Sequence, residues 1–282
     1  MTPSNDKSRL HAMATEESAL PLDGGQIHAC QDGPRDAPAL VLIHGTAASL
    51  RTWDPMVPLL TGSHRVIRID LPGCGQSAQP DGASYAVPAQ AHRVGAALDR
   101  LGVEQAIVVG HSSGGLVATA LTEQRPDLVT ALALISTGPN MAAYIADEIA
   151  LGPAQWPDLT DEQLRQIMSP AFSVDYQIPQ PLVDEARGMN LHVFAATSQA
   201  VRAYLEEQAL PERLATLGKP LLVIFGEDDR RWRSSSATEY RAVPGATVEM
   251  LPGVGHSPNL EDPPRTAVPL LAFTANQAPQ AD

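Results

Sequence analysis

Short apolar runs alternate with segments of helical periodicity along most of the chain. Several runs are apolar throughout, which is typical of strands in a parallel sheet that is covered on both faces. The strand-like runs are residues 39–43, 65–69, 106–109, 129–135, 220–225 and 247–251. Helical patterns occupy 52–60, 88–101, 114–124 and 265–273. This alternation predicts an α/β protein with a mostly parallel, doubly wound sheet.

The regular alternation stops after Ile135 and resumes at Pro220. About 84 residues lie between them, whereas a crossover between parallel strands needs about a dozen or somewhat more. The surplus is too long for a structureless loop. It consists of short helical stretches punctuated by prolines, so we expect a helical cap over the carboxyl edge of the sheet, where ligands bind in open α/β sheets. The expected organisation is a core of residues 21–139 and 208–275, a cap of 140–207, and flexible tails of 1–20 and 276–282.

Composition narrows the functional class. The 282 residues are 44% apolar, and no run of 18 apolar residues is present to span a membrane. The polar first 20 residues do not resemble a secretory signal. A net charge of −13 argues against nucleic-acid binding. The two cysteines, Cys30 and Cys74, form no metal or redox motif, so we expect free thiols in the cytoplasm. The expected partner is a small-molecule substrate with an apolar part, with no membrane; the sequence leaves the oligomeric state open.

Ser112 lies at the centre of the pattern G-x-S-x-G, formed with Gly110 and Gly114. The pattern alone is weak, but here a strand-like run precedes it and a helix-like run follows it. In that order the chain reverses sharply and leaves the serine hydroxyl exposed at a strained turn. The neighbouring Ser113 does not fit, because a histidine stands two residues before it. We therefore interpret Ser112 as a nucleophile.

A serine nucleophile needs a general base and a group that orients the base. Two histidines follow Ser112, and His192 falls inside the expected cap. His256 follows the strand-like run 247–251 within a glycine-rich loop, which places it at the edge of the sheet. We predict that His256 is the base.

The acid is expected after the strand-like run that ends at Phe225. The chain there reads Gly226-Glu227-Asp228-Asp229, and three consecutive carboxylates are ambiguous on chemistry alone. A turn at Gly226 favours a residue beyond it, so we choose Asp229, with Asp228 as the alternative.

Two N–H donors should hold the oxyanion that forms when a serine attacks a carbonyl. The backbone N–H of Ser113 is one, since it begins a helix whose dipole favours negative charge. The loop after the run 39–43 should supply the other, and Thr46 is the best candidate. His44 in the same loop is expected to brace it by hydrogen bonding rather than to act as a base.

Five segments occur in an order that resembles the capped α/β-hydrolase superfamily. They are His44-Gly45, the run from Asp70 to Ser77, Gly110 to Gly115, Gly226 to Asp229, and Gly253 to His256. The resemblance implies an eight-stranded sheet with the cap inserted after the sixth strand. It also supports Asp229 as the acid, and it implies that no metal or cofactor is needed. A serine at the elbow, where epoxide hydrolases and haloalkane dehalogenases of this fold carry Asp, argues against those two chemistries.

The resulting hypothesis is a serine hydrolase that cleaves a carboxylic ester, lactone or thioester through an acyl-enzyme on Ser112. One alternative keeps Ser112, His256 and Asp229 but hydrolyses a C–C bond or performs a cyclase or lyase step in biosynthesis. An alternative of another class is a ligand receptor on the same fold. The natural substrate is not readable from the sequence, because cap contents and pocket size determine it.

Overall fold

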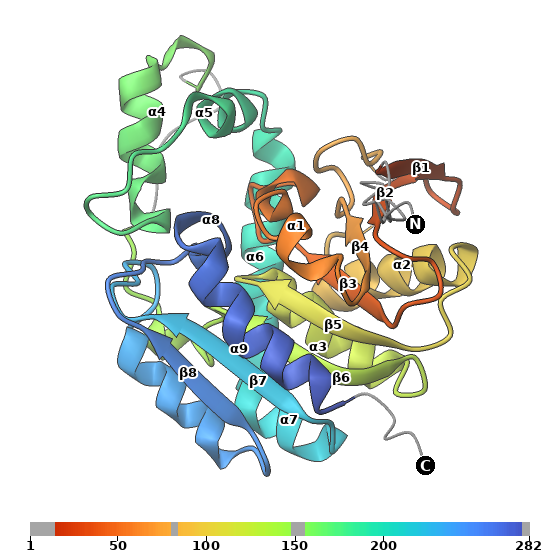
Figure 1. Cartoon of the computed structure of the whole chain (residues 1–282). Coiled ribbons are helices and arrows are strands. Elements are labelled where there is room, and N and C mark those ends of the chain that lie inside the picture. The colour runs from red at the N-terminus through yellow and green to blue at the C-terminus, as the bar shows by residue number, and fades with distance from the viewer. Residues whose placement is uncertain (1–14, 80–83, 148–155, 278–282) are drawn as a thin grey trace, which may run out of the picture.

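The computed structural model describes residues 15–79, 84–147 and 156–277 (Figure 1). Its centre is an eight-stranded sheet in the order β1-β2-β4-β3-β5-β6-β7-β8. Pairs β1–β2 and β2–β4 are antiparallel, and all the others are parallel. The strands are β1 Glu16–Leu20, β2 Ile27–Asp32, β3 Ala39–Ile43, β4 Arg65–Ile69, β5 Ala106–His111, β6 Val129–Ile135, β7 Leu221–Gly226 and β8 Thr247–Leu251. The expected α/β-hydrolase fold, with a mostly parallel sheet, is confirmed.

Helices cover both faces of the sheet and bury two separate apolar clusters. On one face, α2, α3 and α7 pack with η5 over residues such as Val41, Val108 and Val223. On the other face, η1, α1 and α9 cover residues such as Leu42, Val109 and Ile224. These elements are α1 Val57–Leu60, α2 Val87–Arg100, α3 Gly114–Gln124, α7 Leu210–Leu217, α9 Pro263–Ala275, and the 3₁₀ helices η1 Leu50–Trp53 and η5 Ser234–Ala242. Strands covered on both sides explain the uninterrupted apolar runs of the sequence.

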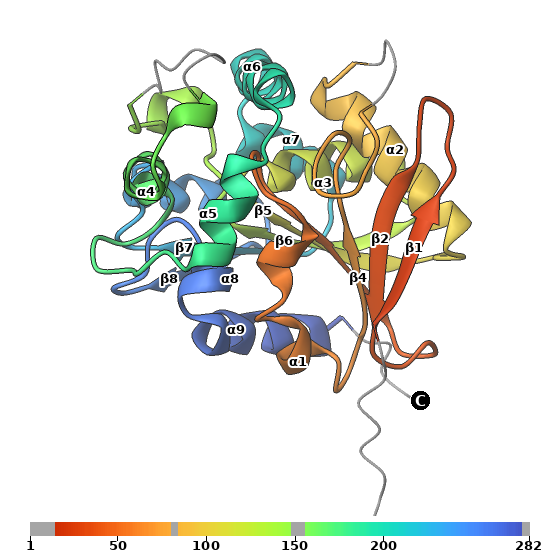
Figure 2. The same cartoon turned by 90° about the horizontal axis from the view of Figure 1, so that it is seen from above.

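A helical segment lies between β6 and β7, and we call it the insertion. Its elements are η2 Met141–Ala143, η3 Trp156–Asp158, α4 Asp161–Met168, η4 Ser169–Ala171, α5 Gln180–Arg187 and α6 Leu191–Glu207. In Figures 1 and 2, α4 and α5 lie at the end of the sheet where α8 (Pro258–Glu261) begins. Trp156, Leu164 and Val183 form a small core of their own, while Tyr204 and Leu205 of α6 join the main core. The insertion thus stands over the carboxyl edge, as the length of the gap between strands predicts.

Two expectations from the sequence differ from the structure. Residues 16–20 were expected in a flexible tail but form edge strand β1, which pairs with β2 from Glu16↔Gln31 to Leu20↔Ile27. Backbone pairing fixes this strand although its side chains are mostly exposed, so it leaves no apolar run in the sequence. Residues 1–14 and 278–282 of the expected tails lie outside the described residues.

The helix expected from Thr52 to Leu60 is broken into η1 and α1. The N-cap of η1 is Ser49, whose hydroxyl accepts the N–H of Arg51. Pro58 lacks the N–H that a helix continuing from η1 would need, so the regular helix starts afresh at Val57. Among the described residues, no helix is both long and apolar enough to cross a bilayer.

Candidate active site

Ser112 sits at the sharp turn between β5 and α3. Its φ is +53°, a left-handed conformation that costs a non-glycine residue about 1–3 kcal/mol. The turn is so tight that a Cβ on Gly110 would lie 2.4 Å from the Gly114 carbonyl oxygen. A Cβ on Gly114 would lie 2.4 Å from the carbonyl oxygen of Ile43. Glycine at both flanks is therefore a steric requirement of the turn, as the sequence pattern predicts.

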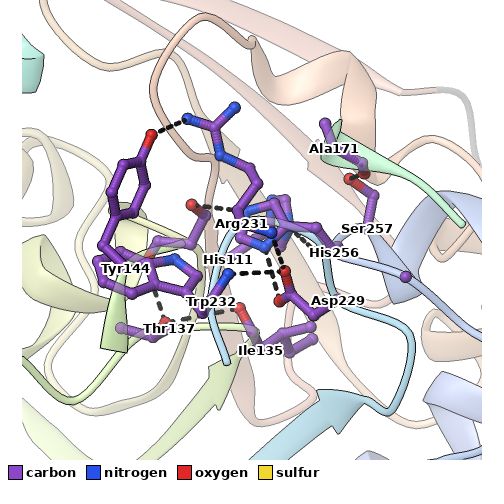
Figure 3. Close-up of polar contacts among 12 residues, drawn as sticks. His111, Ile135, Thr137, Tyr144, Ala171, Asp229, Arg231, Trp232, His256 and Ser257 are labelled. Carbon is purple, nitrogen blue, oxygen red and sulfur yellow. Dashed lines mark hydrogen bonds and ion pairs between the residues drawn. The ribbon is translucent and has the colours of Figure 1, made fainter. Parts of the chain in front are cut away.

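His256 connects Ser112 to Asp229 through two hydrogen bonds. Figure 3 shows the imidazole of His256 beside the carboxylate of Asp229. His256 Nε2 lies 2.9 Å from Ser112 Oγ, and its Nδ1 lies 2.8 Å from Asp229 Oδ2. Since an ionised carboxylate only accepts hydrogen bonds, Nδ1 carries a proton and Nε2 has a lone pair for the serine hydroxyl. We call these three residues the Ser–His–Asp cluster. They come from loops after β5, β7 and β8, so residues far apart in sequence meet at one edge of the sheet.

Asp229 is buried at 7% exposure, and its second oxygen is also occupied. Asp229 Oδ1 accepts the backbone N–H groups of Arg231 at 2.8 Å and Trp232 at 3.0 Å. These bonds stabilise the charged carboxylate and fix its orientation toward His256. Asp228, the alternative acid, is exposed, and its N–H donates to the Val254 carbonyl. The geometry therefore favours Asp229 over Asp228 as the partner of the imidazole.

The two expected oxyanion donors lie next to each other, but one is engaged. The Thr46 N–H donates to Ser113 Oγ at 2.7 Å, and the two hydroxyl oxygens are 2.8 Å apart. The backbone N–H of Ser113 belongs to the first turn at the N-terminus of α3. The Ser113 side chain therefore takes the place at the Thr46 N–H where the sequence suggested a substrate oxygen. The oxyanion roles of Thr46 and Ser113 stay predictions.

His44 braces its loop, as expected. Its Nε2 accepts the N–H of Leu71 at 2.9 Å, so its Nδ1 carries the proton and donates to the Gly45 carbonyl at 2.7 Å. Complete burial lowers the pKa of His44 and keeps the ring neutral. His192 lies on the exposed side of α6 and does not belong to the cluster.

Two further residues hold the histidine loop, and no sequence pattern identifies them. His111 Nε2 donates to the His256 carbonyl at 2.8 Å. Glu261 accepts three backbone N–H groups, from Gly255 and Ser257 beside the histidine and from Ser173 in the insertion. His111 occupies a variable position of G-x-S-x-G, and Glu261 stands among other polar residues in α8. Neither position carries a distinctive pattern, so only the folded geometry identifies them.

A cavity of about 10 Å³, roughly the room of one water molecule, lies beside Thr46 and Ser113. Gly45, Gln90 and Thr197 are among its other lining residues, so it reaches from the loop after β3 to helix α6. A larger open hollow of about 820 Å³ lies around Arg68, and no member of the Ser–His–Asp cluster lines it. The described residues include no group of three or more His, Cys, Asp or Glu side chains placed to hold a metal ion.

Known proteins resemble the chain over most of its length. A family model described as "Alpha/beta hydrolase family" matches residues 40–268. A Pseudomonas syringae protein named as a carbamate hydrolase, RutD, is 31% identical over 260 residues, covering 89% of this chain and 98% of its own. A Bacillus subtilis protein named as a 2-succinyl-6-hydroxy-2,4-cyclohexadiene-1-carboxylate synthase is 24% identical, and the match covers 86% of this chain and 92% of that protein.

A solved structure agrees with the match to the family model. A hydrolase from Pseudomonas aeruginosa PA01 superposes with a TM-score of 0.75 at 26% identity, covering 93% of this chain and 99% of that one. The family model matches well over half of the chain and spans Ser112, Asp229 and His256. The chain is therefore a member of the α/β-hydrolase family.

Proposed function

We propose that this hydrolase cleaves a carboxylic ester, lactone or thioester through an acyl-enzyme on Ser112. His256 takes the hydroxyl proton of Ser112 as the serine oxygen attacks the carbonyl carbon. It then donates that proton to the leaving group, and the acyl group stays on Ser112. His256 next activates a water molecule, which releases the carboxylic acid and restores the serine.

Asp229 keeps the proton of His256 on Nδ1 and stabilises the imidazolium that forms during the attack. The negative oxygen of the tetrahedral intermediate is proposed to bind the backbone N–H groups of Ser113 and Thr46. The N-terminus of α3 favours negative charge at the same place.

One observation carries the proposal: a single imidazole lies 2.9 Å from the hydroxyl of a strained serine and 2.8 Å from a buried carboxylate. Such an arrangement activates a hydroxyl that is otherwise a weak nucleophile. The serine also has a positive φ, and backbone strain of this kind concentrates at reactive sites.

A fluorophosphonate probe and a panel of p-nitrophenyl esters graded by acyl length test the proposal. The wild-type protein is expected to be labelled on Ser112 and to turn over at least one ester many times. Ser112→Ala is expected to lose both labelling and turnover. Full esterase activity in Ser112→Ala would show that another residue performs the reaction.

A second candidate has support from a relative. The match to the Bacillus subtilis protein named as a cyclohexadiene-carboxylate synthase covers 86% of this chain, so the alternative is a biosynthetic cyclase or lyase step, or C–C bond hydrolysis, with the same three residues. Turnover of a vinylogous diketone with little activity on any ester in the panel would favour this alternative.

A further inference from the structure

We infer that the Ser113 side chain closes the oxyanion site of the free protein, so that its hydroxyl must turn away before the Thr46 N–H can bind a substrate oxygen. The inference rests on the proposed acyl-transfer function of Ser112. It assigns Ser113 a positioning role that is separate from the role of its backbone N–H.

The first support is the hydrogen bond between the two residues. The Thr46 N–H points at Ser113 Oγ over 2.7 Å, which is a short N–H···O distance. An oxyanion held by this N–H would have to lie in the same direction and at nearly the same distance. Because two oxygen atoms cannot share that place, the hydroxyl and the substrate oxygen compete for one donor.

The second support is the hydroxyl of Thr46. Its Oγ1 lies 2.8 Å from Ser113 Oγ, so the backbone and the side chain of one residue both hold the Ser113 hydroxyl. Moving the Thr46 N–H would need a change of backbone conformation, whereas the Ser113 hydroxyl turns about a single side-chain bond. We therefore take Ser113 as the partner that turns.

The third support is the space beside the pair. Ser113 and Thr46 line the cavity of about 10 Å³, together with the polar residues Gln90 and Thr197. Rotation about one side-chain bond moves a hydroxyl by only a few ångströms, between staggered positions. Because the cavity lies beside the hydroxyl and has room for about one water molecule, we expect the turned hydroxyl to enter it.

The closed state is expected to slow the reaction by a modest factor. An intramolecular hydrogen bond between neutral groups has a small net value, so opening the site reduces the rate only a few-fold. Ser113→Ala retains the backbone N–H and removes the competing hydroxyl. It should therefore raise the rate, whereas a merely structural loss would lower it.

The test measures the second-order rate at which a fluorophosphonate labels Ser112. In this reaction the serine oxygen bonds to phosphorus, fluoride leaves, and the serine proton passes to His256. We expect Ser113→Ala to react about three- to ten-fold faster than wild type. Thr46→Val, which removes only the hydroxyl partner of Ser113, should give a smaller increase.

The matched control is Thr122→Val, since Thr122 is buried in α3 and its hydroxyl bonds to the Ala118 carbonyl, away from the site. Its labelling rate should equal that of wild type. The acceleration in Ser113→Ala should be the same across the pH profile, because a hydroxyl does not titrate in this range. An equal or slower rate in Ser113→Ala, while Ser112→Ala abolishes labelling, would overturn the inference and leave the proposed function standing. Absence of labelling in wild type would contradict both.

Discussion

Asp229 illustrates how single atoms determine the chemistry of the site. One carboxylate oxygen faces His256, and the other accepts two backbone N–H groups. An amide in its place has only one acceptor oxygen. Its NH₂ group would then face either Nδ1–H or the backbone donors, so one set of hydrogen bonds must be lost.

Asp229→Asn is therefore expected to lower kcat by roughly 10⁴-fold on a reporter ester, the size typical of changing the orienting acid of a serine triad to an amide. Asp228→Asn is the matched control, since that side chain is exposed one residue away. Its kcat should stay within about two-fold of wild type. A larger loss in Asp228→Asn than in Asp229→Asn would reverse the assignment of the acid.

The two cysteines are expected to be unreactive in the folded protein. Burial raises the pKa of Cys74 to about 12, and Asp70 adds to the rise. Burial likewise raises the pKa of Cys30 to about 11. Because the thiolate is the reactive form, iodoacetamide at pH 8 should label neither residue on the time scale in which it labels the unfolded chain. Rapid labelling of Cys74 in the native protein, followed by mass spectrometry, would contradict this expectation.

At the scale of elements, the loop that carries His256 is held between the sheet and the insertion. Glu261 of α8 binds the N–H groups of Gly255, Ser257 and Ser173, and Ser257 Oγ donates to the Ala171 carbonyl at 2.8 Å (Figure 3). A Cβ on Gly255 would lie 2.2 Å from the Ser173 nitrogen, so the two segments are in direct backbone contact. The insertion therefore supports the position of the imidazole as well as covering the site.

Glu261→Gln should disturb this support. The new NH₂ group would replace a carboxylate oxygen that accepts a backbone N–H, so two donors would face each other. We expect a loss of about 1–3 kcal/mol in the free energy of unfolding, the usual penalty of an unsatisfied polar group, and a fall in kcat larger than any change in KM. Glu249→Gln on the exposed side of β8 is the control. Denaturant unfolding and steady-state kinetics check both effects; an unchanged kcat in Glu261→Gln would mean that the loop needs no such support.

Elements with strong apolar patterns were predictable, and those fixed by backbone pairing or by tertiary contacts were not. The buried strands β3 to β7, the partly exposed edge strand β8 and helices α2, α3 and α9 follow their patterns closely. β1 is an exposed edge strand and carries no apolar run. β2, with the sequence Ile-His-Ala-Cys-Gln-Asp, mixes polar and apolar residues although all six are buried, so its pattern does not predict a strand. The candidate site was located from motif order, whereas His111 and Glu261 act through bonds that no local pattern predicts.

At the scale of the whole molecule, folding buries a histidine that prefers to be charged in water at low pH. Burial, together with the nearby His256, lowers the pKa of His111 from 6.5 to about 3. Between these two values the unfolded chain binds a proton that the folded protein does not. The contribution of His111 to stability is therefore complete above pH 6.5 and is lost progressively as the pH falls toward 3.

The free energy of unfolding should rise with pH across this window, by up to about 1.4 kcal/mol per pH unit from His111 alone. His111→Gln should flatten the slope, whereas His92→Gln, at an exposed position of α2, should leave it unchanged. Denaturant midpoints measured at pH 4.5, 5.5 and 6.5 provide the comparison. Parallel slopes in wild type and His111→Gln would show that the proton uptake belongs to other groups.

The sheet gathers the loops after β3, β5, β7 and β8 at one edge, where we propose that an acyl group is transferred to Ser112. The most direct test mixes the protein with a p-nitrophenyl ester, quenches within the first turnovers and maps the peptides by mass spectrometry. We expect a burst of p-nitrophenol and an acyl group on the peptide that contains Ser112, and we expect both to be absent in Ser112→Ala. Release of p-nitrophenol by the wild-type protein with no acyl group on Ser112 would contradict acyl transfer to this residue.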